Sequence, residues 1–409
     1  MSSDEAIPPL VPPALGTWRA PAHPDLAAPD AARLVARAVV RRGGEVTPLH
    51  PERTSVSGSH LRPPLGDLAD LLTPTHGGRR RSVRDVMLAT DTDGWIVARG
   101  RTVYAEHYRP GLGATSRHLL LSVSKSIVGV VVGILVGQGV VDVEALVAAY
   151  VPELRWGGYA DARVRDVLDM RSGVAFREDY LDPRAGIAQL EQAVGWAPRS
   201  PGVPVGLRAF LASLPGDRPA GGPFCYRSCE TDVLGWVCEA VTGLAFADLA
   251  SRLLWARIGA QFDATISVDG QGTGVVDGGI SATLPDLTRF GLMLAAGGAA
   301  LGEQVVPRAW IADTLRGGPD SRAAFANSPD DTRMPGGMYR NQVWLPFPGH
   351  DVLVCLGIHG QLLYVNTRSG TVAAKVSSWP HAQDPRKLWD TLIACAAIDA
   401  HLTQLRPPA

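Results

Sequence analysis

The sequence predicts an α/β (α+β) protein: an antiparallel sheet flanked by helices, with an all-helical insert. Short β-rich runs separated by turn signals occupy residues 85–108, and similar runs return after about residue 338. Between about residues 120 and 315, apolar residues recur at helical spacing instead. The chain closes with residues 388–405, which have the pattern of an amphipathic helix. Strands at both ends of a helical middle predict one α/β unit that carries an insert.

We expect three parts along the chain. Residues 1–80, rich in proline and glycine, form an N-terminal extension that wraps the α/β region, and residues 31–41 within it have the pattern of a short helix. Residues 81–130 and 285–409 form the α/β domain, and residues 131–284 form a mainly helical domain. Because catalytic clefts often lie between domains, we expect the active site in the cleft between these two.

The individual elements follow from local patterns. The runs VMLAT, GWIVARG and TVYAEHY, separated by turn residues, predict an antiparallel meander. Segment 121–141 is apolar on all sides, interrupted by glycines and short for a membrane span, which predicts a buried core helix. Later helices are predicted at 187–196, 207–214, 231–242, 246–258, 287–296 and 307–315. The closing strands are NQVWLP, DVLVCLGIHG, LLYVNT and TVAAKVSSW.

Composition argues against several classes of function. The formal net charge is −1, so no global field favours nucleic acid or an anionic membrane. The five cysteines are odd in number and lack zinc-ligand spacing, which favours reduced thiols and no metal site. The first residues lack the basic and apolar regions of a signal peptide. We therefore expect a cytoplasmic protein that needs no cofactor and acts on a small molecule; a homodimer stays open.

The start of segment 121–141 carries the first candidate chemistry. Ser122 and Lys125 are three residues apart, which places them on one face of a helix, and a lysine amine can activate a serine hydroxyl. Alternatively, Ser122 caps the helix and Lys125 is a solvated residue of its first turn. Only three of the 39 basic residues are lysines, and arginine cannot serve as a neutral base. Neither Lys375 nor Lys387 has a serine three residues before it.

A serine–lysine pair also needs a second proton carrier and donors for an oxyanion. The run GPFCYRSCETDVLGW supplies Tyr226 and Ser228 just before a predicted helix. The run LGIHGQLLY places Ile358, His359 and Gly360 in a strand pattern, where glycine can mark the close approach of a ligand. The alternatives are a buried core tyrosine and a structural histidine.

These motifs, in this order, resemble the penicillin-recognising serine hydrolase superfamily, which includes class C β-lactamases, DD-peptidases and esterase relatives. The phrases FCYRSCETDVLGW, DATISVDGQGTG, DGGISATLPDL, GIHGQLLY and KVSSWP most resemble its branch that hydrolyses 6-aminohexanoate oligomers. The similarity spans residues 85–405. It implies a β-lactamase/DD-peptidase-like fold with the active site in the cleft between sheet and helical insert.

The resemblance also implies the catalytic roles. Ser122 matches the acylated nucleophile, Lys125 the general base, and Tyr226 the tyrosine that relays a proton to the leaving amine. The backbone N–H groups of Ser122 and Ile358 match the oxyanion hole. Burial and the positive helix end are both expected to lower the pKa of Lys125 and so help it accept a proton.

The substrate-side residues follow from the same resemblance. Tyr180 matches a tyrosine on a loop that closes over substrate, and Glu191 and Asp277 fall where the amide hydrolases place polar residues toward substrate. Ser228 and His359 are further substrate-binding candidates at positions that depart from the usual Tyr-x-Asn and Lys-Thr-Gly motifs. Because the lysine that helps hold a β-lactam carboxylate is absent, β-lactams and peptidoglycan termini are less expected as substrates.

Three functions remain open at this point. The leading hypothesis is a serine hydrolase that cleaves a small linear amide or ester through an acyl-enzyme. An acyltransferase would form the same acyl-enzyme and pass it to an amine or alcohol. A non-catalytic binding relative is the third, and it predicts a lost nucleophile or base, whereas Ser122, Lys125 and Tyr226 are all present.

Overall fold

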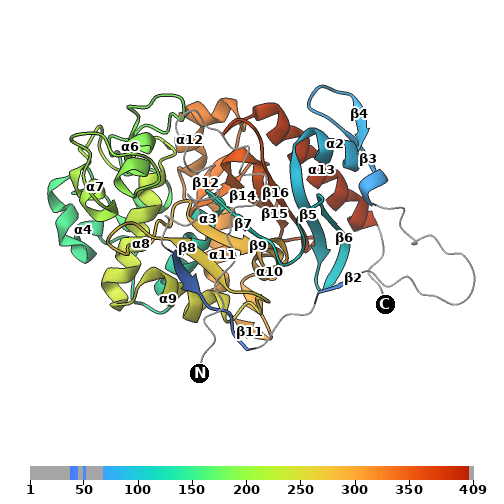
Figure 1. Ribbon diagram of the computed structural model, residues 1–409, viewed down its shortest axis with the longest axis horizontal. Coiled ribbons are helices and arrows are strands. Elements are labelled where there is room, and N and C mark those ends of the chain that lie inside the picture. Colours follow the sequence, from blue (N-terminus) through green and yellow to red (C-terminus); the bar gives the residue numbers. More distant parts are fainter. Residues whose placement is uncertain (1–36, 45–48, 52–67, 405–409) are drawn as a thin grey trace, which may run out of the picture.

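The computed structural model describes residues 37–44, 49–51 and 68–404 (Figure 1). Most of the predicted N-terminal extension lies outside these residues. The helix predicted at 31–41 is wrong in its described part, because Arg37–Val40 forms strand β1 and pairs antiparallel with β8 (Ala264–Ser267). Pairing with a neighbouring strand decides the conformation here, as it often does for short segments.

The main sheet has eight strands and joins the two ends of the chain. In sheet order they are β12 (Met338–Arg340), β13 (Val343–Leu345), β14 (Val352–Gly357), β15 (Gln361–Asn366), β16 (Thr371–Ser377), β5 (Thr92–Arg99), β6 (Thr102–Tyr108) and β2 (His50–Pro51). All neighbours pair antiparallel except β2 with β6. Strand β16 lies beside β5, which confirms the predicted antiparallel sheet built from both ends (Figure 1).

Helices cover both faces of this sheet (Figure 1). On β5, Trp95 packs in the apolar cluster that includes α2 (Val83–Ala89) and α13 (Pro385–Gln404). Its neighbour Ile96 packs in the opposite cluster, which includes α10 (Leu284–Ala295). This alternation is the two-residue period of a strand that is buried on both sides.

Helix α2 replaces the strand predicted for VMLAT. The side chain of Ser82 caps the helix by accepting a hydrogen bond from the backbone N–H of Asp85. Val83, Val86 and Met87 are buried, at the spacing of one helix face. A short apolar run does not distinguish a strand from a helix by periodicity alone, and here the cap and the inward face favour the helix.

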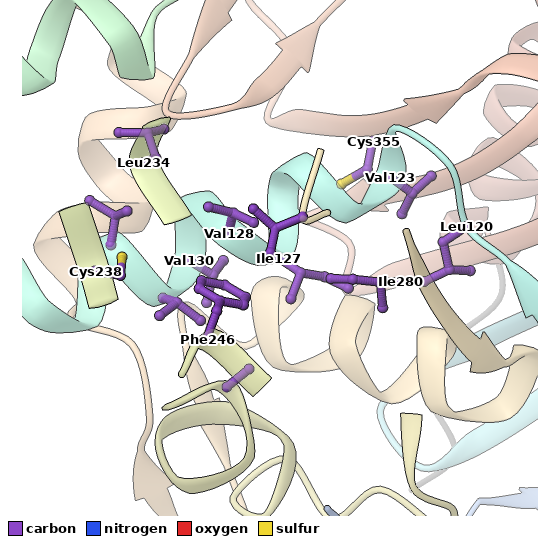
Figure 2. Close-up of a cluster of buried hydrophobic side chains, with 14 of the residues drawn as sticks. Leu120, Val123, Ile127, Val128, Val130, Leu234, Cys238, Phe246, Ile280 and Cys355 are labelled. Atoms are coloured by element: carbon purple, nitrogen blue, oxygen red, sulfur yellow. The ribbon is translucent and has the colours of Figure 1, made fainter. Parts of the chain in front are cut away.

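Helix α3 (Val123–Gly137) is the predicted buried core helix, surrounded by apolar side chains from several elements (Figure 2). Its glycines lie at the closest contacts. A Cβ atom on Gly129 would lie 2.4 Å from the carbonyl oxygen of Asn341, and one on Gly133 would lie 2.5 Å from the ring of Trp310. Larger residues at these positions would push α3 away from its neighbours.

The middle of the chain is mainly helical. Its helices are α4 (Val147–Tyr150), η3 (Pro152–Trp156), α5 (Val164–Leu168), α6 (Gly186–Ala193), α7 (Leu207–Ser213), α8 (Ser228–Thr242), α9 (Phe246–Ala250) and the π-helix η4 (Ser251–Trp255). It also contributes to a four-stranded sheet of order β1-β8-β9-β7, with β9 (Ile280–Thr283) and β7 (Arg117–Leu119). The predicted domain boundaries near residues 130 and 284 stay a prediction.

Shorter elements complete the described chain. They are η2 (Leu68–Asp70), β3 (Leu72–Pro74), β4 (Arg80–Ser82), β10 (Ala299–Ala300), β11 (Glu303–Gln304), α11 (Arg308–Arg316), α12 (Ser321–Ala326), η5 (Pro329–Thr332) and η6 (Ile358–Gly360). In the residues described, no single helix is long and apolar enough to cross a membrane; α8 with α9–η4 passes that test only as a pair, bent by 82°. All five cysteines are unpaired thiols.

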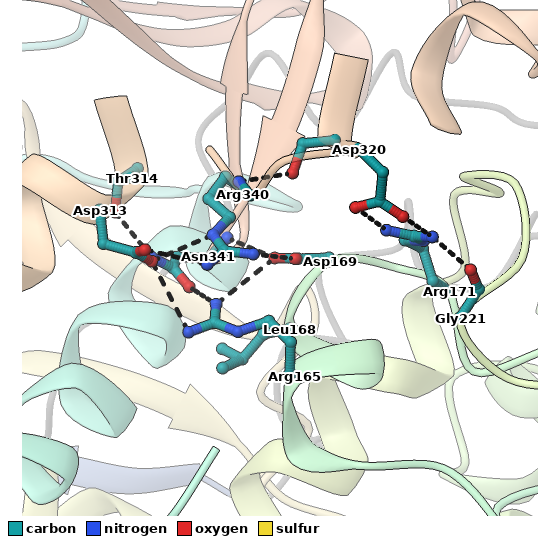
Figure 3. Close-up of polar contacts among 12 residues, drawn as sticks. Arg165, Leu168, Asp169, Arg171, Gly221, Asp313, Thr314, Asp320, Arg340 and Asn341 are labelled. Atoms are coloured by element: carbon teal, nitrogen blue, oxygen red, sulfur yellow. Dashed lines mark hydrogen bonds and ion pairs between the residues drawn. The ribbon is translucent and has the colours of Figure 1, made fainter. Parts of the chain in front are cut away.

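A partly buried ion network joins the helical middle to the main sheet (Figure 3). Arg340 on β12 donates to Asp169 at 2.7 Å and, through two nitrogens, to Asp313 on α11 at 2.9 and 3.0 Å. A nitrogen of Arg165 lies 3.7 Å from Asp169, and another lies 3.6 Å from Asp313. Because removing one partner would leave a buried charge uncompensated, the network holds these segments in a fixed relative position.

Candidate active site

Ser122 stands at the start of α3, directly after a strained backbone position. Leu121 has a φ of +48°, in the left-handed region that few residues other than glycine adopt. Ser122 is the N-cap residue, but its side chain makes no capping hydrogen bond. Instead its Oγ accepts a hydrogen bond of 3.0 Å from Nζ of Lys125. The helix-cap alternative therefore does not describe the hydroxyl of Ser122.

Lys125 is buried, with a relative exposure of 1%. Its ammonium group donates to Ser122 Oγ at 3.0 Å, to Ser228 Oγ at 3.0 Å and to the backbone carbonyl of Asp277 at 2.8 Å. Three is the full number of donors that a lysine ammonium has. The side chain is thus held in one orientation, and the alternative of a solvated lysine is wrong.

The pKa of Lys125 departs from the expectation. Burial lowers this pKa, but interactions with Tyr226, Asp277 and Glu178 outweigh burial and raise it above its ordinary value. A carboxylate oxygen of Asp277 lies 3.6 Å from Nζ. The predicted lowering is wrong because the sequence argument included burial and the helix end but neither Tyr226 nor the neighbouring carboxylates. At neutral pH the resting protein therefore carries an ammonium ion on Lys125.

Tyr226 comes from the loop directly before α8, and an interaction with the side chain of Ser122 acts to lower the pKa of its phenol. Its ring stacks on Trp344 with a centroid distance of 5.3 Å, and Nζ of Lys125 lies 5.4 Å from its centre. Burial raises the pKa of Tyr226, although Lys125 opposes this shift. The phenol therefore carries its proton at neutral pH, beside Ser122, where a proton donor to a leaving group must stand.

Glu178 is a residue of this site that the sequence argument missed. It is half-buried and accepts hydrogen bonds from the backbone N–H of Ser228 at 2.9 Å, the hydroxyl of Ser228 at 2.6 Å and the hydroxyl of Tyr180 at 2.6 Å. Burial raises its pKa, while Lys125 and these hydrogen bonds oppose the shift. The available signal was the phrase REDYLDP, in which this acid stands two residues before Tyr180.

Asp232 is a second missed residue, and it lies one step further from Ser122. One of its carboxylate oxygens accepts the backbone N–H groups of Val276 and Asp277, both at 3.0 Å. These bonds fix the chain segment whose carbonyl, on Asp277, accepts a hydrogen bond from Lys125. The sequence offered no signal for this role, because it depends on a loop that returns to α8 from 44 residues further along the chain.

Ile358 follows β14, where the strand passes close to the backbone before Ser122. A Cβ atom on Gly357 would lie 2.6 Å from the carbonyl oxygen of Leu120. The next residue, His359, is turned away: it is 2% exposed, and its Nδ1 lies 2.7 Å from the carbonyl oxygen of Trp379. Burial lowers the pKa of His359 to about 4, so the imidazole is neutral.

Two cavities meet at Ser122, and both are also lined by Tyr180 and Ile358. The larger chamber, of about 630 Å³, is lined among others by Tyr226, Arg333, Trp344, Leu362, Trp379 and Leu388. The acidic chamber, of about 430 Å³, is lined among others by Ile187, Glu191, Trp196, Ser228, Val275 and Asp277. A substrate bound across Ser122 can therefore place one half in each chamber.

The predicted substrate-binding residues divide accordingly. Tyr180 lines both chambers, and Glu191, Asp277 and Ser228 line the acidic chamber. His359 is the exception, because its ring is buried against the backbone of Trp379 and it lines neither chamber. The structure therefore does not support a substrate contact for His359. Within the described chain no group of three His, Cys, Asp or Glu side chains is arranged to hold a metal ion.

Comparisons with known proteins show the family and the fold. The Beta-lactamase family profile matches residues 83–398. A 6-aminohexanoate-dimer hydrolase from Paenarthrobacter ureafaciens is 38% identical over 368 residues, which cover 90% of this chain and 88% of that relative. A solved structure of a candidate 6-aminohexanoate-dimer hydrolase from Bacillus anthracis superposes with a TM-score of 0.78 at 21% identity, covering 91% of this chain and 92% of that one.

The fold is shared more widely. A penicillin-binding protein homologue from Caulobacter crescentus superposes with a TM-score of 0.58 at 15% identity, covering 78% of this chain and 96% of that one. The resemblance predicted from the sequence is thereby confirmed for both fold and family. The chain, with its serine–lysine pair at the start of a buried helix, belongs to the Beta-lactamase family of serine hydrolases.

Proposed function

We propose that Ser122 is the nucleophile with which this hydrolase cleaves a small linear amide or ester through an acyl-enzyme. One observation carries the proposal. Three hydrogen bonds hold the Nζ atom of Lys125 in place, one of them to Oγ of Ser122, and Ser122 lies where two cavities meet. A buried lysine held against a serine that faces a cleft is the arrangement that activates a hydroxyl.

Lys125 must lose a proton before it acts as a general base, and Ser228 offers a path. The hydroxyl of Ser228 accepts a hydrogen bond from Lys125 at 3.0 Å and donates one to Glu178 at 2.6 Å. Transfer of one proton along this path leaves a neutral amine on Lys125, a hydroxyl on Ser228 and a carboxylic acid on Glu178. The raised pKa of Glu178 favours the protonated acid. Neutral Lys125 then takes the proton of Ser122 as Oγ attacks the carbonyl carbon.

The remaining steps use Tyr226 and the backbone. The N–H groups of Ser122 and Ile358 stabilise the oxyanion, and donors of this kind contribute about 3–4 kcal/mol each. Tyr226 gives its proton to the leaving nitrogen or oxygen as the bond to the carbonyl carbon breaks, and the ammonium of Lys125 restores that proton. Water then attacks the ester on Ser122 by the same proton transfers in reverse order, which releases the acid and the free enzyme.

The acidic chamber suggests the substrate class. Glu191 and Asp277 line it, and their carboxylates suit an ammonium group at the end of an acyl chain. The relative from Paenarthrobacter ureafaciens carries the name of a linear amide with such an end, the 6-aminohexanoate dimer. We therefore propose amides and esters of ω-amino acids as substrates, with the acyl chain in the acidic chamber.

The experiment is a screen of 6-aminohexanoyl amides against short-chain nitrophenyl esters, with wild type and Ser122→Ala side by side. We expect hydrolysis by wild type, adduct formation at Ser122 with a serine-reactive phosphonate, and neither with Ser122→Ala. Full activity in Ser122→Ala would refute the assignment of the nucleophile. Added amines or alcohols distinguish the transferase alternative, because a transferase forms a new amide or ester from them.

Location and assembly are also proposals. The five unpaired thiols, four of them buried, favour a reducing compartment such as the cytoplasm. Fractionation of the native host should place the protein with cytoplasmic enzymes, and recovery from an oxidising compartment would contradict this. The homodimer stays a prediction that sedimentation analysis of the purified protein tests directly.

A further inference from the structure

The two chambers are not equivalent with respect to the proton donor. Tyr226 lines the larger chamber but not the acidic chamber. If the proposed function holds, on which this inference rests, Tyr226 must give its proton to the leaving nitrogen. The leaving group therefore occupies the larger chamber, and the acyl chain occupies the acidic chamber. A linear substrate then runs from Glu191 through Ser122 toward the far end of the larger chamber.

Arg333 is the one cationic residue that lines the larger chamber in the part of the chain that the structure describes. Its backbone is anchored, because its carbonyl oxygen accepts a hydrogen bond of 2.8 Å from the indole N–H of Trp389. Its side chain is 31% exposed, and Nη1 donates to Asp330 at 3.0 Å. Within the described contacts the guanidinium uses Nη1 alone, so its other nitrogens remain available to an acceptor.

The rest of the larger chamber suits an unbranched chain. Trp344, Leu356, Leu362, Trp379 and Leu388 give it a largely apolar lining, which suits contact with a chain of methylene groups. Asp384 also lines it, but one oxygen of that carboxylate accepts the backbone N–H of Lys387 at the start of α13. Arg333 is therefore the lining residue whose charge can attract an anionic end of the substrate.

We propose that Arg333 binds the carboxylate of the leaving amine, so that the enzyme prefers ω-amino acids as leaving groups. A guanidinium matches a carboxylate through parallel N–H donors, which a neutral or cationic leaving group cannot use. The cleft is then bipolar: carboxylates in the acidic chamber hold the ammonium end of the substrate, and Arg333 holds its carboxylate end. This assigns a selectivity for the leaving group that the catalytic residues alone do not provide.

The test uses three amides with the same 6-aminohexanoyl acyl group. Their leaving amines are 6-aminohexanoate, hexylamine and 1,6-diaminohexane, which end in a carboxylate, a methyl group and an ammonium group. Initial rates of acyl-chain release give kcat/KM for wild type, Arg333→Gln and the matched control Arg184→Gln. Arg184 lines the adjoining groove but not the larger chamber. The double variant Arg333→Gln/Asp330→Asn also removes the charge of the half-buried partner that the single variant leaves unpaired.

In wild type we expect a preference for the carboxylate-bearing substrate over the hexylamide of about tenfold or more. Both Arg333 variants should lose this preference, mainly through a higher KM, and keep their activity on the hexylamide. Arg184→Gln should behave as wild type. Equal loss on all three substrates, or an unchanged preference, would overturn the role of Arg333 while leaving the proposed function intact. Failure of wild type to cleave any of the three would refute both.

Discussion

Lys125 and Lys375 are buried lysines of the same chain with closely similar contacts. Each is 1% exposed, and each donates a hydrogen bond to a serine hydroxyl, Ser122 for the first and Ser377 for the second. Each ammonium lies 5.4 Å from the centre of an aromatic ring and donates to a backbone carbonyl. A contact between lysine and serine therefore does not by itself identify a nucleophile in this protein.

The two lysines differ in the charges around them. Burial lowers the pKa of Lys375 to about 7, and the opposing interactions with Cys395, Asp93 and Asp91 do not offset this effect. For Lys125, burial acts in the same direction, but Asp277 and Glu178 help to reverse the shift. The pKa values of the two buried lysines are thus shifted in opposite directions. Lys125, which keeps its proton, is linked through Ser228 to Glu178, an acid that can accept that proton.

They differ as well in access. Ser122 lines both chambers, whereas Ser377 is fully buried and lines neither. A substrate carbonyl can reach the first hydroxyl and not the second. Under the proposed mechanism, a reactive serine in this protein needs three things together: a lysine, a proton acceptor behind that lysine and a cavity in front of the serine.

The largest expected effect separates the two serines. Ser122→Ala should lower kcat/KM by about 10⁴-fold or more, as loss of a catalytic nucleophile does, while Ser377→Ala should change it by less than about threefold. The measurement is hydrolysis of the substrates found in the screen, with circular dichroism to confirm that both variants fold. A comparable loss in a folded Ser377→Ala protein would contradict the division between the two sites.

Much of this site was predictable, for a physical reason. Ser122 and Lys125 are three residues apart on a helix, so their side chains meet whatever surrounds them. The pair formed by Lys375 and Ser377 does not fit the pattern of a serine three residues before a lysine, which is the spacing of a helix face. These two residues are two positions apart on a strand, where such residues share a face. The contact of Glu178 with Ser228 joins residues 50 positions apart, and no local pattern specifies it.

The fold shows the same limit. The buried helix after Ser122 and the antiparallel sheet came from periodicity, and both are confirmed. The strand Arg37–Val40 and helix α2 were predicted as the wrong type of element, because a few residues of apolar pattern fit either a helix or a strand. The packing partner decides between the two conformations: β8 for the strand and α13 for the helix. Local sequence thus specifies long elements better than short ones.

The second prediction tests the acid behind Lys125. Glu178→Gln should lower kcat by about 10²-fold, because the proton of Lys125 then has no acceptor through Ser228. The pH profile should change with it: since the pKa of Lys125 lies above its ordinary value, the residual rate should rise with pH across the alkaline range. Ser228→Ala should give the same profile. A loss that is equal at every pH would instead indicate a structural role for Glu178.

A smaller effect is expected in the acidic chamber. Glu191→Gln should raise KM by about fivefold for amides whose acyl chain ends in an ammonium group, and should leave KM for the matching hexanoyl amides unchanged. Steady-state kinetics with both acyl chains give the ratio of the two KM values. The control is Glu303→Gln, because the side chain of Glu303 is exposed and lines neither chamber. The same increase with both acyl chains would exclude recognition of the ammonium group by Glu191.

The smallest effect on activity, and a distinct one on stability, is expected at Lys375. In the folded protein the pKa of Lys375 is lowered to about 7, whereas in the unfolded chain it stays near its ordinary value, so between these pH values the unfolded state binds more protons. The free energy of unfolding of wild type should therefore increase with pH above 7 relative to Lys375→Met, by at most about 1.4 kcal/mol per pH unit.

Urea unfolding of both proteins at pH 7, 8 and 9 measures the difference, and the activity of Lys375→Met should remain within about twofold of wild type because Lys375 lines neither chamber. A constant difference in stability across this range would mean that Lys375 keeps its charge when buried, and that the two lysines do not differ in protonation.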